Sequence, residues 1–474
     1  MGWADPCCGD LPGSGGNHDR FRSGQVPPSL VQEGNVSGTD FPCLTLAPVL
    51  HNPMPPSWSG AIWIGEVWLD AVDSASQASV SSGRPAVCRL QNAEGFSRAR
   101  LLVRGRERAV GFVDLAVNDS EVAFSDLRDQ VVAQQYSLTR SVSAQAKTGP
   151  TEVAHVTVIV CTRDRTDMLK SALASILASN HPDFGVLVVD NAPSSDATRE
   201  FVTGLADPRV RLITEPVPGL SRARNAGLLA ATADVVAFVD DDVVVDRDWL
   251  NILVRGFGYG DSVACVSGMV PAGELRTPAQ AYFENRVSWS ESADVRVFEW
   301  SQAPKDVPLF PFEVRHYGTG ANFAVDRRVA LSVGGFDERL GAGTPASGGE
   351  DIDMFFRILR SGRQLVNEPA AIAWHRHRST ADDLRAQTRG YGLGLGAWLA
   401  KVASDPAMAM LAAKTVVRQG SALVRHLRSA SQSATPSAAV ADDLPQDIGN
   451  GTWRYVLKGI WAYLVTPRVR GAGS

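Results

Sequence analysis

The chain has 474 residues, of which 44% are hydrophobic and 20% are charged, and its formal net charge is −5. This length exceeds what one ordinary hydrophobic core needs, so we expect about two to four domains in a soluble globular protein. The negative net charge argues against nucleic-acid binding as a main role, because proteins that follow a phosphate backbone normally carry a clear basic excess. A small-molecule or glycan substrate is the better expectation.

The cysteines and the apolar runs favour a cytoplasmic protein. The six cysteines include no CxxC pair, which is typical of reduced, structural thiols. The sequence does not begin with a basic segment followed by an apolar stretch, so we predict no signal peptide. No run of about 18 apolar residues is present, so we predict no transmembrane helix. These features are compatible with a cytoplasmic protein and with a peripheral protein on the inner face of the cell membrane.

Three segments precede the most regular part of the chain. Residues 1–40 are rich in Gly, Ser, Pro and Asp and have too few apolar side chains to offset the entropy of ordering, which predicts disorder. Residues 41–135 contain short strand-like runs, and residues 105–108 are typical of a hairpin turn between two of them. We therefore predict a small β-rich domain whose function the sequence does not indicate. Residues 136–152 are polar and contain a Gly-Pro pair, which indicates a linker.

Strands and helices alternate after this linker. An apolar strand at 156–162 is followed by a helical apolar stripe that begins near Thr166, and a second strand ends at Asp190. A short helix and a third strand follow at the same spacing. This pattern predicts an α/β domain over 153–392, with a Rossmann-like, mostly parallel sheet and helices on both faces. Acidic strand ends such as Asp190 then fall at the ligand-binding edge of the sheet.

The next apolar strand ends in three adjacent carboxylates, Asp240, Asp241 and Asp242. Adjacent anions repel one another unless a positive charge lies among them. At the carboxyl end of a strand, such a cluster suits a hard divalent cation and a phosphate-bearing substrate. Taken alone, the run is also typical of a solvated acidic turn before the helix that begins near Asp248.

Three further motifs have a chemical and a purely structural interpretation. Arg222 and Arg224 lie where a helix starts, which suits a diphosphate but also surface ion pairs. Glu350 and Asp351 start another helix, where a carboxylate can accept a proton or simply complement the helix dipole. His375 follows a short apolar run, where an imidazole can complete an oxygen-rich metal site or pack as an ordinary side chain.

In this order, the motifs of residues 155–390 resemble those of the inverting family 2 glycosyltransferases, which have a GT-A fold. The resemblance rests on the segments 158–165 (VIVCTRDR), 188–191 (VVDN), 223–227 (ARNAG), 238–242 (FVDDD), 334–337 (GGFD), 349–353 (GEDID) and 374–375 (WH).

The resemblance implies a nucleoside-diphosphate sugar as donor and Mg²⁺ or Mn²⁺ as cofactor. It implies a metal bound by Asp240, Asp242 and His375, and Asp351 as the general base that makes transfer inverting. The acceptor is expected to be a glycan, a lipid-linked molecule or a small-molecule glycoside, as in the synthesis of cell-envelope polysaccharides. Donor contacts are implied for Thr162, Arg163, Asp164, Asp190, Arg224, Asn225, Asp240 and Asp241, and an acceptor-side position for Glu350 and Asp353. Asp164 departs from the Asn or Glu that relatives often have at this position.

Residues 393–474 predict a helical extension whose end is aromatic and basic, with Trp453, Trp461, Arg454 and Lys458. Such a segment can lie in a membrane interface, which fits a lipid-linked acceptor, or pack against the catalytic domain. A homodimer is also compatible with the sequence. Two rival functions are an inactive nucleotide-sugar or glycan-binding module and a nucleotidyltransferase. The latter is disfavoured because no glycine-rich phosphate loop follows the strand at 156–162.

Overall fold

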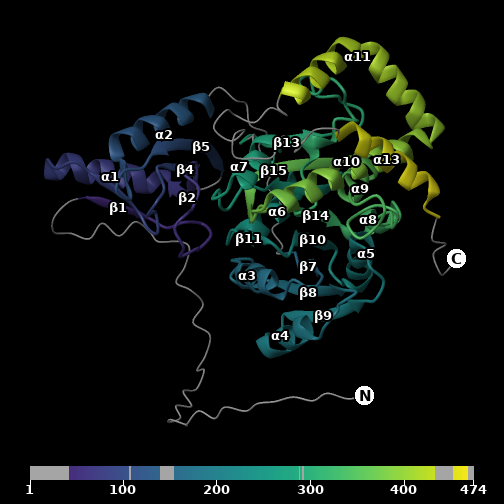
Figure 1. The fold of residues 1–474 in the computed structure, drawn as a ribbon, viewed down its shortest axis with the longest axis horizontal. Helices are drawn as coiled ribbons and strands as arrows, with labels where there is room; N and C mark the ends of the chain where they lie inside the picture. Colours follow the sequence, from purple (N-terminus) through teal and green to yellow (C-terminus); the bar gives the residue numbers. More distant parts are fainter. Residues whose placement is uncertain are drawn as a thin grey trace, which may run out of the picture.

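The computed structural model describes residues 42–105, 108–138, 154–287, 289–290, 293–432 and 452–467. The segment predicted to be disordered, 1–40, and most of the predicted linker lie outside these residues. Figure 1 shows the described part as a central sheet with helices around it, an N-terminal region on one side and the helices of the C-terminal region toward the other.

The described part of the N-terminal region contains two small sheets and two helices. One sheet has the order β1-β3-β6 and the other β2-β4-β5. Strands β4 and β5 pair antiparallel, as the predicted hairpin requires, whereas the helices α1 and α2 were not predicted. Helix α1 buries only Val72 and Ala75, so its apolar periodicity is too weak to signal a helix. The elements are β1 (Cys43–Leu46), β2 (Ile62–Trp68), α1 (Leu69–Ser82), β3 (Val87–Leu90), β4 (Arg98–Arg104), β5 (Ala109–Ala116), β6 (Glu121–Ala123) and α2 (Phe124–Leu138).

Nine of the described strands form one mixed sheet of order β11-β15-β12-β14-β10-β7-β8-β9, with β13 paired to β15. The half β10-β7-β8-β9 is parallel, while β14 runs antiparallel to both β10 and β12. The strands are β7 (Val156–Thr162), β8 (Phe184–Asn191), β9 (Val210–Glu215), β10 (Val235–Asp240), β11 (Val243–Val245), β12 (Val263–Met269), β13 (Arg296–Phe298), β14 (Asn322–Asp326) and β15 (Gln364–His375).

Helices cover both faces of this sheet because its strands are apolar on both sides. Ile159 and Phe238 belong to the core under α5 and α9, whereas their strand neighbours Val158 and Val239 belong to the opposite core under α3 and α6. The helices are α3 (Thr166–Leu177), α4 (Ala197–Leu205), α5 (Leu220–Ala230), α6 (Trp249–Gly256), α7 (Pro278–Arg286), α8 (Arg327–Ser332) and α9 (Glu350–Arg360). The predicted α/β class with helices on both faces is confirmed.

The strand register brings polar residues together at one edge of the sheet. Thr162 at the end of β7 lies opposite Asp190 at the end of β8, and Asp240 at the end of β10 lies opposite Cys161. Parallel strands end at the same edge, which is where open α/β sheets bind their ligands.

The N-terminal region packs directly on the sheet. Its Ile62 donates a backbone hydrogen bond to the carbonyl of Leu275, and an apolar cluster that includes Ile64, Met269 and Trp374 spans the boundary. The two parts therefore share buried surface next to His375.

Three helices complete the described chain: α10 (Ala381–Ala403), α11 (Pro406–Gln432) and α13 (Thr452–Val465). The predicted helical C-terminal region is confirmed. Helices α10 and α13 touch through their backbones, because a Cβ on Gly396 would overlap the carbonyl of Val456 and one on Gly459 would overlap the carbonyl of Leu393. Among the helices of the described ranges, none has the length and apolar character that a membrane span requires.

Candidate active site

A cavity of about 640 Å³ lies at the carboxyl edge of the sheet. Strands β7 and β10, the starts of α5 and α9, the end of β15 and helix α10 all contribute to its lining. Nine of the residues singled out from the sequence line it: Thr162, Arg163, Arg224, Asp240, Asp241, Asp242, Glu350, Asp351 and His375. Asp164, Asp190, Asn225 and Asp353 are not among the lining residues.

The three aspartates after β10 are not a solvated turn, because Asp241 and Asp242 are 3% and 8% exposed. Asp241 accepts hydrogen bonds from the Thr162 hydroxyl at 2.7 Å and from Arg165 at 2.5 Å, and burial raises its pKa to about 7. Asp242 accepts from Arg165 at 2.7 Å, and its other oxygen lies 3.3 Å from Nε2 of His375. Burial opposes ionisation of Asp242 too, but His375 and Arg165 outweigh it and hold the pKa of Asp242 below its usual range. Arg165 therefore supplies positive charge to two of the three adjacent carboxylates.

Arg224 connects the aspartates to the start of α9. This buried guanidinium donates to Asp240 at 3.1 Å, to Glu350 at 3.0 Å and to the carbonyl of Gly320 at 2.9 Å. Burial, followed by repulsion from Asp351, raises the pKa of Glu350 to about 7. Because three of its five N–H donors are directed to these protein groups, Arg224 holds both acidic motifs on one cavity.

Asp351 is held by two backbone donors at the start of α9. Its Oδ2 accepts from the amide of Gly320 at 2.7 Å, and its Oδ1 accepts from the amide of Ile352 at 2.8 Å. The preceding Gly349 has φ +86°, and a Cβ there would lie 2.7 Å from the carbonyl oxygen of Gly394 on α10. Only glycine fits this close approach, so helix α10 fixes where α9 begins and where Asp351 points.

Two aspartates near the ends of β7 and β8 differ in their partners. Asp190 is 1% exposed, and its Oδ1 has no hydrogen-bond partner among the described residues. Burial, together with the nearby charge of Asp164, raises the pKa of Asp190. Asp164 instead accepts two hydrogen bonds from Ser194 at 2.8 Å, which lower its pKa. A buried carboxylate oxygen without a donor is costly, so Asp190 fits a ligand that brings an N–H or O–H.

Asn225 has a structural position. Its side chain donates to the carbonyl of Phe336 at 2.9 Å and accepts from the amide of the same residue at 2.7 Å. These two bonds tie α5 to the turn around Gly335, away from the cavity lining.

His375 belongs to a buried chain of hydrogen bonds. Its Nδ1 lies 2.8 Å from Nδ1 of His377, whose Nε2 lies 2.9 Å from Glu284. Burial works against ionisation of Glu284, but His377 outweighs it and keeps the pKa of Glu284 low, while burial lowers the pKa of His377. An ionised Glu284 accepts from Nε2–H of a neutral His377, whose Nδ1 then accepts from Nδ1–H of His375. This order leaves Nε2 of His375 as the nitrogen that faces Asp242.

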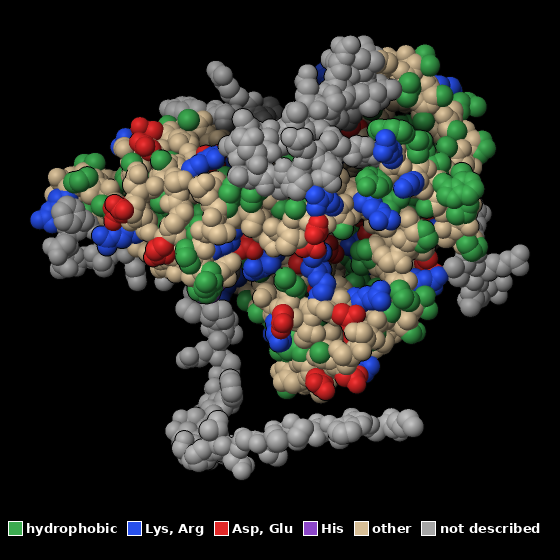
Figure 2. Space-filling model, viewed as in Figure 1, with side chains coloured by type: hydrophobic (Ala, Val, Ile, Leu, Met, Phe, Trp, Pro, Cys, Tyr) green, Lys and Arg blue, Asp and Glu red, His purple; other side chains and the backbone are tan. Residues whose placement is uncertain are grey.

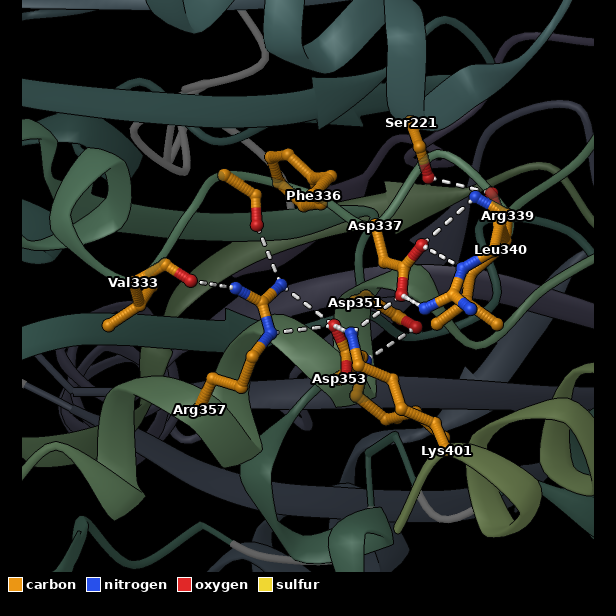
Figure 3. A network of polar contacts seen from close by, with 12 residues as sticks. Ser221, Val333, Phe336, Asp337, Arg339, Leu340, Asp351, Asp353, Arg357 and Lys401 are labelled. Atoms are coloured by element: carbon orange, nitrogen blue, oxygen red, sulfur yellow. Dashed lines mark hydrogen bonds and ion pairs between the residues drawn. The ribbon is translucent and has the colours of Figure 1, made fainter. Parts of the chain in front are cut away.

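Asp353 lies in a second polar network, shown in Figure 3. Its carboxylate accepts from Arg357 at 2.8 Å and from Lys401 of α10 at 2.9 Å, and Lys401 also pairs with Asp337 at 2.8 Å. Asp337 and Arg339 contact Tyr463 of α13. Two residues along a helix turn the side chain by roughly 200°, so Asp353 points away from the side of α9 that carries Asp351.

Several residues of the site were not found from the sequence. Arg165 and Arg378 both lie near Asp242, at 2.7 and 3.6 Å, and Trp289 and Tyr391 bring aromatic surface to the cavity. Arg165 stands inside the segment quoted for the resemblance, and charge balance with three aspartates is the signal that could have found it. The others depend on contacts between distant segments.

A divalent cation fits part of this geometry. Within the residues that the structure describes, no three His, Cys, Asp or Glu side chains form a ready metal site. However, Oδ1 of Asp242 and Nε2 of His375 are 3.3 Å apart, close to the roughly 3 Å between adjacent ligands of an octahedral ion with bonds of about 2.1 Å. These two donors fit one ion whose remaining positions would be taken by diphosphate oxygens, Asp240 or water.

Comparison with known proteins identifies the class of protein. The family described as Glycosyl transferase family 2 matches residues 157–331. The chain is 30% identical over 229 residues to the succinoglycan biosynthesis protein ExoM of Rhizobium meliloti, covering 47% of this chain and 67% of ExoM. The chain therefore belongs to glycosyltransferase family 2. Together with the mixed sheet, this membership confirms the predicted GT-A fold class.

Other relatives match over a smaller share of their length. A pre-mycofactocin glycosyltransferase of Mycobacterium tuberculosis is 27% identical over 56% of this chain and 52% of its own. A glucosyl-dolichyl phosphate glucuronosyltransferase of Haloferax volcanii is 28% identical over 39% and 57%. The chain thus spans about half the length of these curated relatives. Among solved structures, a mannosyltransferase of Pyrobaculum calidifontis in complex with GDP-Man and Mn²⁺ aligns with a TM-score of 0.44 at 19% identity, over 72% of this chain and 94% of its own.

Proposed function

We propose that this protein is a metal-dependent, inverting glycosyltransferase that moves a sugar from a nucleoside-diphosphate sugar to an acceptor hydroxyl. The observation that carries the proposal is one cavity that brings Asp242 and His375 together with Asp351. The first two residues suit a cation and a diphosphate, and the third suits proton removal. A module that only binds a nucleotide sugar or a glycan has no need of a proton acceptor at Asp351.

The donor side is formed by the ends of β7, β8 and β10. Asn191 of β8 lines the cavity, and the adjacent Asp190 lies just outside the lining. Its Oδ1, without a partner among the described residues, is suited to accept an N–H from a nucleobase that reaches it, and Thr162 and Arg163 lie at the end of the neighbouring strand. Arg165 and Arg378, now paired with Asp242, are placed to exchange this partner for phosphate oxygens. Mg²⁺ or Mn²⁺ held by Asp242, His375 and Asp240 would neutralise the charge that develops on the leaving diphosphate.

The proton of the acceptor hydroxyl is taken by Asp351. Hydrogen bonds from the amides of Gly320 and Ile352 hold both oxygens of this carboxylate. The lone pairs that remain free therefore have a fixed orientation. Attack on the anomeric carbon from the face opposite the diphosphate inverts its configuration, and general-base help is typically worth about 10²–10⁴-fold. Glu350 is held by Arg224 and serves to keep the two acidic motifs together.

The acceptor side is aromatic and apolar. Trp289 and Tyr391 line the cavity beside His375, and Leu395 of α10 continues this lining. Such a surface suits the faces of a sugar ring in a glycan or a glycoside. It equally suits a lipid-linked acceptor of the kind in the name of the Haloferax volcanii relative.

The first test is a screen of nucleotide sugars with and without Mn²⁺ or Mg²⁺. We expect at least one nucleoside-diphosphate sugar to bind in a metal-dependent manner, measured by calorimetry, and to release nucleotide when a suitable acceptor is present. Asp351→Asn should keep donor affinity within about twofold and reduce transfer by about 10²-fold or more, because the amide cannot accept the proton.

Asp242→Asn is the companion variant, and it should lose metal-dependent donor binding. Absence of any metal-dependent donor would overturn the proposal as a whole. Equal transfer by Asp351→Asn and the unchanged protein would overturn the base assignment alone.

A further inference from the structure

Helix α13 has one packed and one exposed face. Gly459 and Tyr463 are buried against the catalytic domain, in contact with α10 and with the cluster around Leu340. The opposite face exposes large apolar side chains at intervals of three and four residues, which places them on one stripe of the helix. These are Trp453 (62% exposed), Leu457 (57%), Trp461 (68%), Leu464 (61%) and Val465 (52%).

The charge of this region is opposite to that of the chain. The α11 and α13 segments contain no Asp or Glu but six basic residues, although the whole chain has a net charge of −5. Four of these basic side chains are exposed, and on α11 two of them, Lys414 and Arg418, flank the exposed Val416 and Val417. The six are Lys414, Arg418, Arg425, Arg428, Arg454 and Lys458. Figure 2 shows hydrophobic and basic side chains gathered over α13 and the neighbouring part of α11.

We propose that the exposed face of α13, with the adjoining part of α11, binds an anionic phospholipid surface. Exposed tryptophans with leucine on one helical stripe enter the boundary between headgroups and acyl chains. Flanking Lys and Arg side chains pair with anionic headgroups. The basic α11 and α13 segments of this otherwise acidic chain therefore fit an anionic surface better than a neutral apolar partner. Helix α13 has 14 residues and therefore lies along the interface.

This placement also gives the cavity an orientation. Helix α10 contacts α13 through Gly396 and lines the cavity with Tyr391 and Leu395, which are themselves 45% and 41% exposed. Leu399, 39% exposed, continues their spacing along α10. If the proposed function holds, a lipid-linked acceptor reaches the cavity along this side of α10. Lipid binding itself does not depend on the transferase activity.

The test is co-sedimentation of the full chain with vesicles, without any nucleotide sugar. We expect binding to phosphatidylcholine vesicles that contain about one third phosphatidylglycerol, and weaker binding to pure phosphatidylcholine. Exchange of Arg454 and Lys458 for Gln should lower the partition coefficient by about thirtyfold, because each basic residue near an anionic surface raises the coefficient about fivefold. Exchange of Trp453, Leu457 and Trp461 for Ser should lower it by a similar factor or more.

Matched controls come from the other end of the molecule. Val80 on α1 is 84% exposed, and the side chains of Arg89 and Arg128 are 65% and 51% exposed. The Val80→Ser variant and the Arg89→Gln, Arg128→Gln pair should keep the partition coefficient of the unchanged chain. All variants are surface changes, so their thermal midpoints should agree within about 2 °C.

Two outcomes would overturn the inference. One is no binding of the unchanged chain to anionic vesicles at low salt. The other is equal binding of the chain and of its Trp453, Leu457, Trp461 variant. A dimer that becomes a monomer in this variant, without vesicle binding, would assign the face to a protein partner instead. Donor binding is measured separately on the Trp453, Leu457, Trp461 variant. A loss of lipid binding with donor binding retained concerns the surface of α13 alone, whereas absence of donor binding in the unchanged chain concerns the proposed function.

Discussion

Three adjacent aspartates acquire different properties from their surroundings. Asp241 is buried on Thr162 and Arg165 with a pKa raised to about 7, whereas Asp242 stays ionised beside His375. Asp240 is the most open of the three, with a side chain 34% exposed, and it pairs with Arg224. Adjacency in sequence therefore does not make these carboxylates equivalent, and we assign to Asp242 the largest part in cation binding.

We predict that Glu284 controls the metal affinity of His375, which it reaches only through His377. Glu284→Gln removes the carboxylate charge that accepts from Nε2–H of His377, which weakens the hydrogen-bond chain that orients Nε2 of His375 toward Asp242. We expect the affinity for Mn²⁺ in the presence of nucleotide to fall about 10- to 100-fold, measured by titration of free Mn²⁺. Binding of nucleotide without metal should be unchanged.

The control for this prediction is Glu368→Gln. Glu368 is also buried, at 1% exposure, but it accepts from Tyr259 and does not line the cavity. It should leave Mn²⁺ affinity unchanged. If Glu284→Gln also leaves the Mn²⁺ affinity unchanged, the hydrogen-bond chain from Glu284 to His375 does not determine that affinity.

At the scale of elements, α10 connects the start of α9, which carries the proposed base Asp351, with the surface helix α13. Gly394 lies against Gly349 at the start of α9, and Gly396 lies against Val456 of α13. These contacts explain Gly394 and Gly396, each of which would otherwise weaken a helix by about 0.5–1 kcal/mol. The backbones approach so closely that any side chain at these positions would separate the helices.

Gly459→Ala is the corresponding prediction, because its Cβ would overlap the carbonyl of Leu393. We expect the free energy of unfolding to fall by about 1–3 kcal/mol, measured with urea, and α13 to become sensitive to limited proteolysis. Gly204→Ala is the control, since no atom lies within 4 Å of its Cβ position. It should leave stability unchanged or raise it by up to about 1 kcal/mol. Equal effects of the two substitutions would contradict the role given to the glycine contact.

At the scale of the whole molecule, the N-terminal region is bound to the sheet through a buried charge. Arg104 of β4 contacts Glu66 at 3.3 Å and also Asp246 of the catalytic domain, and its side chain is 6% exposed. The cluster of Ile62, Ile64 and Trp374 seals this boundary next to His375. The N-terminal region therefore supports one wall of the catalytic domain.

Arg104→Met should cost roughly 3–5 kcal/mol, because it leaves without a cation the carboxylates of Glu66 and Asp246, whose side chains are only 16% and 14% exposed. The measurement is urea unfolding followed by fluorescence. Arg89→Met is the matched control, since Arg89 forms an exposed pair with Glu121 whose loss should cost less than about 1 kcal/mol. A loss for Arg104→Met no greater than for the control would show that the bridge adds nothing to the boundary.

Much of the catalytic domain could be predicted because its signals are local. Apolar strands that end in Thr162, Asp190 and Asp240 mark the edge of the sheet, and α9 begins at Glu350 as the pattern predicts. The pairing of Arg165 with Asp241 and Asp242, 76 and 77 residues away, has no local signal.

The hydrogen-bond chain from His375 to Glu284 and the helices of the N-terminal region could not be predicted for a related reason. Glu284 lies 93 residues before His377, and only the fold brings them together. In α1 and α2 the apolar residues are few, so tertiary packing decides the helix rather than sequence periodicity.

Arg165 pairs with Asp242 and Arg224 pairs with Asp240, so the protein's own cations already compensate its acidic cluster before any donor arrives. Under the proposed function, a divalent cation and a doubly charged diphosphate together carry almost no net charge, so their binding would be an electroneutral exchange of partners. Long-range attraction then contributes little to donor capture, and ionic strength has little leverage on it. The shape of the cavity and the direction of its hydrogen bonds are left to select the donor.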